Sequence, residues 1–480
     1  MKPAIMHLQH LSHRKVLDCA SPLALSVAPS LTKKRQRTGA LQDAVAIAIG
    51  RRGLLLGIAI SAIGFCAANP ANAADFTVHE WGTFTSVQGG DGELLPWRPL
   101  QTSDLPDFVH DWTKPGLNRF SLGMLANKGL MVTLQRMETP VIYFHSSESM
   151  SVDVSVAFPK GTITEWYPQA AQIGPSLPSN TNAASGALPE SRAVWKNLKL
   201  VPSAAQYGGR YSLQEDKSGS HYFAARQTAG NLVQMDSQDQ TNNVNEAEKF
   251  IFYRGAGSFK TPLRVSVDTN NTVTVENTGA EKLSHLFLVS IEDRGFARAG
   301  RIAVMNGLSG KTTVKWQRLG ALPTADWKIY GPEELQETLA VKMEAALVSE
   351  GLYADEARAM VNTWKDSWFT EDGVRVLYIL PRSWTDEILP LTLNPEPSEL
   401  KRLMVGRAEI ITPDIEASLL SALNSAGKDV ITRQHAMDEL KRLGRFAGPA
   451  LQLASRHTSG TNVLNIGHEL LSNATHSQFE

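Results

Sequence analysis

From Phe76 to about Gln317, hydrophobic residues recur at every second position, and Gly, Asn, Pro and Ser interrupt the pattern. A strand turns successive side chains to opposite faces, so a two-residue period predicts strands that are buried on one face. The predicted strands include Val152–Phe158, Lys249–Arg254, Leu263–Val267, Thr272–Val275 and Leu286–Ile291. Short strands at this spacing indicate one or two sandwich-like antiparallel structures.

Near Pro332 the hydrophobic period lengthens to that of a helix. Two helices are predicted, one marked by Leu335, Leu339, Met343 and Leu347, the other by Ala357, Met360, Val361, Trp364 and Trp368. We expect Gly351 to end the first helix and Asp355 to cap the second. Strands are predicted at Val374–Leu380 and Leu403–Ile411.

The C-terminal part has its own helical signals. Thr412 followed by Pro413 is typical of a helix start, with Thr as N-cap and Pro in the first turn. Further on, apolar residues at helical spacing predict a helix pair of the armadillo or HEAT kind, broken at Gly448-Pro449. We therefore expect an α+β protein with a β-rich part at 74–330, a mixed α/β region at 331–425 and a helical tail at 426–480.

Residues 1–73 predict a cleavable export signal with a long basic leader. A basic region ends at Arg51-Arg52, an apolar stretch follows from Gly53 to Ala68, and Ala71-Asn72-Ala73 supplies small residues for cleavage. Since this stretch is shorter than the roughly 20 residues of a membrane-spanning helix, we expect no stable membrane insertion after cleavage. The pair of arginines also resembles a twin-arginine signal, which would suit a protein that folds around a cofactor in the cytoplasm. The expected location is periplasmic or secreted.

Charge and cysteine content exclude several classes of function. Residues 1–73 carry nine Lys and Arg against two Asp, a net charge of +7. Because the whole chain has a net charge of −1, the remaining residues carry −8. Such an acidic chain lacks the basic surface that nucleic-acid binding requires. The only cysteines, Cys19 and Cys66, lie in the expected signal, so the predicted mature protein is cysteine-free. Disulfides, thiolate nucleophiles and Cys-bound metals are thereby excluded from it.

Several long strings identify a resemblance. The chain reads FTVHEWGTFTSV at Phe76–Val87, RMETPVIYF at Arg136–Phe144, EKFIFYRG at Glu248–Gly255, and VGRAEIITP at Val405–Pro413. Together these strings resemble a family of uncharacterised exported bacterial proteins whose mature chain opens HEWGTFTSV. The resemblance covers most of residues 76–425. It implies export but no activity and no catalytic residue.

Three glutamates lie in strand patterns that are otherwise apolar. Glu80 shares a predicted face with Phe76, Val78 and Phe84, whereas His79 and Trp81 take the other face. Glu138 is predicted on a face with Pro140, Ile142 and Phe144, and Glu165 on one with Ile163 and Tyr167. An unpaired carboxylate is costly in such a place. A cluster of Glu80, Glu138 and Glu165 could supply the acid and base of a glycoside hydrolase.

Two other interpretations of these glutamates are open. With His79, His110 or His145 they could bind a divalent metal through nitrogen and oxygen ligands, although no diagnostic spacing is present. Alternatively, Arg226, Arg254 and Arg375 lie in similar apolar patterns and could pair with them in the core.

Two classes of function follow from these interpretations. The first is a hydrolase acting on an extracytoplasmic polymer through its clustered glutamates, with or without a metal. The second is a non-catalytic binding or assembly protein of the cell envelope, whose partner is a polysaccharide or an envelope protein. A pocket that gathers the glutamates would favour the first class, and glutamates each held by an arginine would favour the second.

Overall fold

The computed structural model describes residues 75–476, apart from 102–104, 112–128, 130, 175–190, 203–210, 212, 217–218, 237–244, 294–297, 322, 325 and 459. The predicted signal at 1–73 lies outside the described residues. All described residues belong to one compact unit, Asn69–Glu480. None of the described helices is long and apolar enough to cross a membrane.

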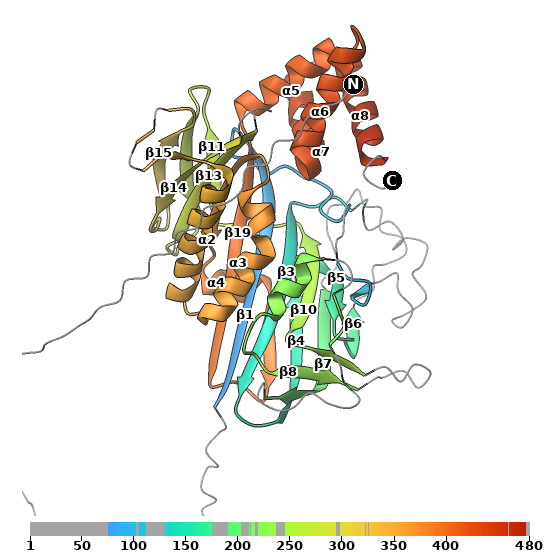
Figure 1. Ribbon diagram of the computed structural model, residues 1–480, viewed down its shortest axis with the longest axis vertical. Coiled ribbons are helices and arrows are strands. Elements are labelled where there is room, and N and C mark those ends of the chain that lie inside the picture. The colour runs from blue at the N-terminus through green and yellow to red at the C-terminus, as the bar shows by residue number, and fades with distance from the viewer. Residues whose placement is uncertain are drawn as a thin grey trace, which may run out of the picture. The chain divides into compact units, whose positions relative to one another are not determined.

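A large central sheet organises the described part of the chain (Figure 1). Its ten strands are, in spatial order, β16 (Lys328–Tyr330), β14 (Arg298–Met305), β13 (Ser284–Asp293), β17 (Gly373–Ile379), β19 (Glu399–Ile411), β1 (Phe76–Gly89), β3 (Gln135–Ser146), β10 (Ile251–Gly257), β5 (Gly161–Tyr167) and β2 (His110–Asp111). Strand β1 pairs with β19 in parallel and with β3 antiparallel. Residues 331–425 thus supply β17 and β19 to the middle of the same sheet as residues 74–330.

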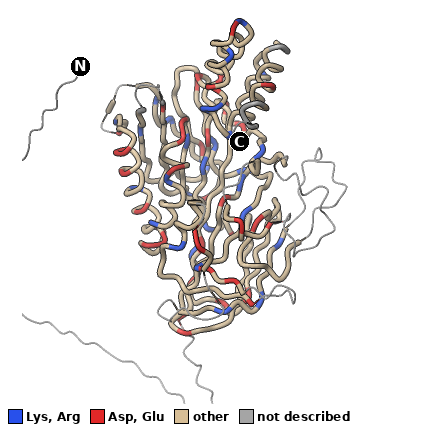
Figure 2. Tube along the Cα trace, turned by 45° about the vertical axis from the view of Figure 1, so that its right-hand side comes forward, with Lys and Arg blue, Asp and Glu red and all other residues tan. Residues whose placement is uncertain are grey.

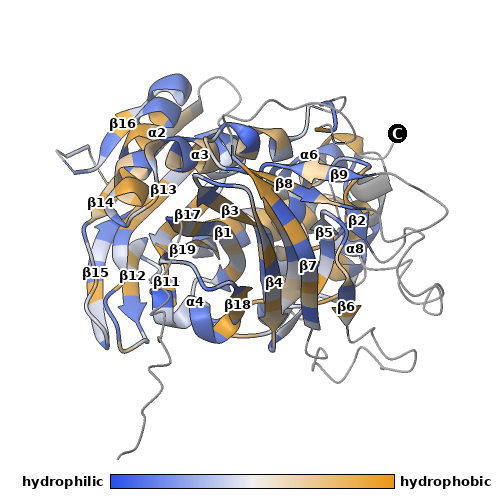
Figure 3. Ribbon diagram, turned by 90° about the horizontal axis from the view of Figure 1, so that it is seen from below, coloured by the Kyte–Doolittle hydropathy of each residue, from blue (hydrophilic) through white to orange (hydrophobic). Residues whose placement is uncertain are grey.

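Two smaller sheets pack against one face of the central sheet. One contains β11 (Leu263–Val267), β12 (Thr272–Asn277) and β15 (Thr312–Arg318). The other contains β18 (Leu391–Asn394), β4 (Met150–Phe158), β7 (Ser191–Val201), β8 (Leu232–Met235) and β9 (Glu246–Glu248), with β6 (Gln172–Gly174) beside β7. Hydrophobic and polar residues alternate along β4 and β7 (Figure 3). The apolar side chains of these sheets and of the central sheet form the first hydrophobic core.

Helices cover the opposite face of the central sheet (Figure 1). They are α2 (Pro332–Ser349) and α3 (Ala354–Phe369), and their apolar residues form the second core with Trp81, Tyr143 and Val289 of the sheet. Gly351 follows α2 with φ +112°, a conformation that favours glycine and ends the helix. The prediction that Asp355 caps α3 is wrong. Tyr353 is the N-cap and Asp355 lies in the first turn, where an acidic side chain also suits the helix dipole.

The C-terminal helices enclose a third core. Helix α5 (Pro413–Ser425) begins as predicted, since the Thr412 hydroxyl accepts a hydrogen bond from the Ile415 amide. It packs with α6 (Val430–Leu443), α7 (Ala447–His457) and α8 (Thr461–His476). The break between α6 and α7 falls at the 3-10 turn Gly444–Phe446, designated η5, and not at Gly448-Pro449. Pro449 is tolerated because it lies in the first turn of α7. The described tail therefore holds more than the predicted helix pair.

The α+β prediction, with a β-rich N-terminal part and helices mainly in the C-terminal part, is confirmed. Two further helical segments matter for the sites below. They are α4 (Arg382–Ile388), beside β19, and the 3-10 helix η4 (His221–Arg226), which contacts α3. Figure 2 shows charged residues of both signs along the strands as well as on the helices. Many of these charged side chains are buried in ion pairs, and some of the pairs line the candidate site described below.

Candidate functional site

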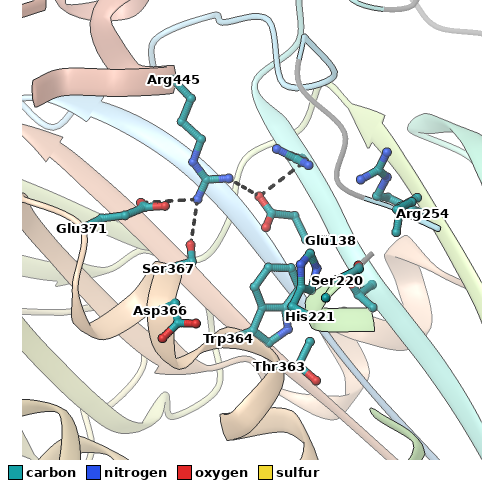
Figure 4. A pocket seen from close by; sticks show the side chains of 14 residues that line it. Glu138, Ser220, His221, Arg254, Thr363, Trp364, Asp366, Ser367, Glu371 and Arg445 are labelled. Carbon is teal, nitrogen blue, oxygen red and sulfur yellow. Dashed lines mark hydrogen bonds and ion pairs between the residues drawn. The ribbon is translucent and has the colours of Figure 1, made fainter. Parts of the chain in front are cut away.

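A pocket of about 700 Å3 opens between β3, α3, η4 and η5, and we call it the Glu138 pocket (Figure 4). Its charged lining consists of Arg136, Glu138, Arg254, Asp366, Glu371 and Arg445. The remaining lining residues are Leu105, Thr139, Gly219, Ser220, His221, Thr363, Trp364 and Ser367. A cavity with convergent polar groups is a natural place to look for a ligand site.

Glu138 reaches this pocket because β3 is irregular. The register between β1 and β3 shifts after the pair Trp81–Val141, and the next pair is Thr83–Glu138. Thr139 adopts φ +51° within this shift. The extra residue reverses the alternation of side chains. Our prediction that Glu138 shares a face with Ile142 and Phe144 is therefore wrong, because those residues point into the first core.

Glu138 is held by two arginines. The Arg445 Nη1 donates to Glu138 Oε1 at 2.8 Å, and Arg136 Nε lies 3.4 Å from the same oxygen. Burial opposes ionisation of this carboxyl, but Arg136 and Arg445 outweigh it and lower the pKa of Glu138. Glu138 is therefore a carboxylate near neutral pH and cannot serve there as a general acid.

Arg445 also connects Glu138 to a second carboxylate. Its Nη2 donates to the Ser367 hydroxyl at 3.2 Å and lies 3.7 Å from Glu371 Oε2 (Figure 4). Arg407 donates to Glu371 at 2.6 Å from behind the pocket wall. Although desolvation opposes it, the arginines lower the pKa of Glu371 to about 2. The Glu371 side chain is 38% exposed, so solvent screening weakens these interactions.

Glu165 lies at the neighbouring strand pair. Arg254 Nε and Nη2 donate to Glu165 Oε2 and Oε1 at 3.0 and 2.8 Å, a bidentate pair, and the Thr164 hydroxyl also donates to Oε2. A register shift after Arg254–Glu165 places Ile163 in the first core and Tyr167 in the second. The predicted shared face of Ile163, Glu165 and Tyr167 is therefore wrong, for the same reason as at Glu138.

Glu80 lies apart from the other two glutamates, on the face of the first core, as the alternation predicted. It accepts hydrogen bonds from the Tyr253 hydroxyl and Arg402 Nε, each at 2.5 Å. Arg402 also donates to Asp386 of α4 at 2.8 Å and lines a second pocket of about 270 Å3. The structure thus brings Glu138 and the Glu165–Arg254 pair to one side of the sheet and leaves Glu80 on the other.

Glu80, Glu138 and Glu165 each pair with an arginine. Of the three arginines expected from the sequence, only Arg254 is one of these partners. Arg226 instead holds Glu248 through two hydrogen bonds of 2.8 and 2.7 Å. Arg375 holds Glu409, with Nε to Oε2 at 3.0 Å. Such buried pairs satisfy both charges without a substrate.

His79 and His145 do come together, on the helix-covered face of β1 and β3. His79 Nδ1 lies 2.6 Å from Glu356 Oε2, and His145 Nε2 lies 2.8 Å from Glu356 Oε1. Glu356 is in the first turn of α3. Burial disfavours its charge, but hydrogen bonds from His145 and His79 lower the pKa of Glu356 overall. These three side chains are a candidate metal centre, since their ligand atoms lie within 4.8 Å of one another.

Four residues that shape these sites were not predicted from the sequence. They are Trp364, Glu371 and Arg445 at the Glu138 pocket, and Glu356 beside the histidines. Trp364 carried the signal of a core helix residue, which it also is. Glu356 lies 211 and 277 residues from its histidines, and Arg445 lies 307 residues from Glu138. Sequence spacing carries no information about contacts over such separations.

Comparisons with known proteins assign no family to the chain. No protein-family model matches it, and no curated protein matches it. Among solved structures, it is similar to the yeast delta-COP-I mu-homology domain, both alone and complexed with a Dsl1 WxWxV peptide. Each match has 8% sequence identity, covers 71% of this chain and 98% or 97% of that domain, and has a TM-score of 0.21. Such a low TM-score supports no conclusion about fold or function.

Proposed function

We propose that this is an exported binding protein of the cell envelope whose Glu138 pocket takes a ligand bearing a carboxylate or phosphate group. The observation that carries the proposal is a pair of buried, unsatisfied donors in the pocket lining. Arg445 Nε and Trp364 Nε1 are buried and have no hydrogen-bond partner among the described residues. Buried polar groups are nearly always paired, so each exception calls for an unseen water, ion or ligand.

The arginines of the pocket lining offer binding groups for an anionic ligand. Glu138 and Glu371 both have lowered pKa values despite the cost of burial, because nearby arginines stabilise their negative charge. The lining holds three arginines and three carboxylates, so an acidic group of a ligand would be stabilised where it meets the Arg445 guanidinium directly. Arginine is the side chain best suited to hold carboxylate and phosphate, since its planar fork matches both. Two sources share this chemistry, the acidic sugars of an envelope polysaccharide and free phosphate.

Glu138 has a positioning role in this proposal. It fixes the guanidinium group of Arg445, which otherwise would lose side-chain freedom on binding a ligand. His221 and Trp364, with ring centroids 5.0 Å apart, supply an aromatic wall beside Glu138 (Figure 4). An aromatic wall suits the apolar face of a sugar ring.

A hydrolase remains the second candidate, because Glu138 and Glu371 are two carboxylates in one pocket. Glycoside hydrolysis needs one carboxyl that stays protonated until it reaches the leaving group. The lowered pKa values of Glu138 and Glu371 make both poor donors of that proton. We therefore place binding ahead of hydrolysis.

Calorimetric titration of the purified chain with galacturonate, inorganic phosphate and neutral galactose tests the proposal. We expect one site for an acidic probe, no heat from galactose, and at least about tenfold weaker binding in Arg445→Gln, since a charged hydrogen bond contributes about 1.5–3 kcal/mol. Arg442→Gln is the matched control, because Arg442 pairs with Glu439 at 2.7 Å three residues away and does not line the pocket.

The outcomes separate the alternatives. Galacturonate bound in preference to phosphate would identify an acidic sugar as the ligand, and the reverse would identify phosphate. Equal binding by wild type and a folded Arg445→Gln variant would overturn the proposal. Release of reducing sugar from an acidic oligosaccharide, abolished by Glu138→Gln, would instead establish the hydrolase.

A further inference from the structure

A second, independent site lies at the other end of β3 and α3, where His79, His145 and Glu356 meet. His145 pairs in register with Thr77, and His79 pairs with Tyr143, so the two histidines are diagonal neighbours on adjacent strands. Glu356 approaches them from the first turn of α3 and offers one carboxylate oxygen to each ring. Three separate elements therefore aim a ligand atom at one point.

Burial makes this cluster a built site. The side chains of His79 and Glu356 are 1% and 0% exposed, and that of His145 is 17% exposed. The ring of Tyr353 covers both imidazoles, with centroids 4.4 Å from His79 and 4.9 Å from His145. The Tyr353 amide also donates to Glu356 Oε2 at 3.1 Å and fixes the carboxylate. His145 is the most exposed of the three side chains.

We propose that His79, His145 and Glu356 form a binding site for a divalent transition metal, with zinc as the ion that best suits the ligands. Imidazole nitrogens with one carboxylate are a frequent zinc set, whereas calcium and magnesium prefer oxygen ligands alone. The ligand atoms, His79 Nδ1, His145 Nε2 and a Glu356 oxygen, lie within 4.8 Å of one another. Three protein ligands leave a fourth tetrahedral position for water.

The three side chains could also be held together by hydrogen bonds alone. A second His–Glu pair in the chain provides a control that distinguishes this role from metal binding. His110 Nε2 lies 2.6 Å from Glu246 Oε1, a similar His–Glu pair, but His110 and Glu246 belong to no group of three ligands among the described residues. A merely hydrogen-bonded role would make the two places alike toward zinc. A metal site would distinguish them.

The experiment is titration of the metal-stripped full chain with zinc chloride, followed by calorimetry and by thermal unfolding. We expect one zinc per chain and a raised unfolding temperature. The variants His145→Ala and Glu356→Gln should bind at least about tenfold more weakly, and His110→Ala should bind as the wild type does. Because His145 is the most exposed ligand, His145→Ala is the variant best able to keep its fold, which circular dichroism would verify.

Cobalt provides a readout that needs no variant. Cobalt bound to the wild type at a four-coordinate nitrogen and oxygen site should give visible absorption that zinc then removes. Absence of stoichiometric zinc binding by the wild type would overturn the proposal. So would zinc binding that persists unchanged in folded His145→Ala or that disappears in His110→Ala. None of these results depends on the acidic ligand of the Glu138 pocket.

Discussion

Buried carboxylates are stabilised by different partners at the two ends of the layer between β3 and α3. At the Glu138 end, arginines of β3 and η5 hold carboxylates. At the Glu356 end, two histidines hold one carboxylate. Seven residue steps separate Glu138 from His145 along β3, which at a rise of about 3.3 Å per residue corresponds to at most about 23 Å. An arginine keeps its charge at any ordinary pH, whereas a histidine can lose its proton and bind a metal. The difference suits one end to an anion and the other to a cation.

The largest expected effect is the difference in the free energy of unfolding between Glu138→Gln and Glu356→Gln, measured in metal-free protein. Glu138→Gln should lower the free energy of unfolding by about 3 kcal/mol, the lower end for a broken buried pair, because Arg445 keeps Ser367 and Glu371. Glu356→Gln should cost about 1–3 kcal/mol, since the amide can still accept one hydrogen bond. Urea denaturation measures both.

The partly exposed pair of Arg442 and Glu439 supplies the control for the comparison of Glu138→Gln with Glu356→Gln. Glu439→Gln removes the partner of Arg442 near the same end of the molecule and should change stability by about 0.5 kcal/mol or less. A larger loss in Glu356→Gln than in Glu138→Gln would contradict the contrast. It would mean that the histidine end, too, depends on fixed charge.

Acid should lower the stability of the protein, because Glu138 and Glu356, one at each end, both have lowered pKa values. A carboxyl whose folded pKa lies below its ordinary value of 4.5 adds stability above pH 4.5, and this stability is lost as pH falls through the folded pKa. Wild-type stability should therefore fall from about pH 4.5 toward pH 2. The slope should be shallower in Glu138→Gln by up to about 1.4 kcal/mol per pH unit, the contribution of one proton.

Unfolding midpoints in urea across pH 3–6 give these slopes. An unchanged slope in Glu138→Gln would show that Glu138 is protonated equally in both states. Glu371, with a pKa of about 2, should contribute less than its shift suggests, because it is partly exposed.

The smallest effect should separate binding from stability. Trp364→Phe keeps an aromatic ring beside Trp368, with which Trp364 stacks at 6.2 Å, but it removes the unpaired N–H together with part of the buried indole ring. We expect a stability loss of about 1 kcal/mol from the lost buried volume and unchanged zinc binding. Acidic probes should bind the folded variant about tenfold more weakly, the effect of one lost hydrogen bond. Calorimetry with the same probes decides, and unchanged affinity would remove Trp364 from the proposed site.

Prediction from sequence succeeded where a local pattern is repeated. The strand Leu263–Val267 and the start of α5 at Thr412-Pro413 follow directly from alternation and capping. The alternation also placed Glu80 and His79 on opposite faces of β1, and the structure agrees. It failed for Glu138 and Glu165, because the register shifts beside them are not visible in the apolar pattern.

By itself, the sequence determined the β-rich and helical parts, because side-chain periodicity is a local property of strand and helix geometry. It also determined that Cys19 and Cys66 are the only cysteines. Only the tertiary structure decided which arginine each glutamate meets and that Glu356 joins His79 to His145. Among these contacts, Arg254–Glu165, His79–Glu356 and Arg402–Glu80 span 89, 277 and 322 residues. They follow from strand order and register, in which one bulge moves a carboxylate from one face of the sheet to the other.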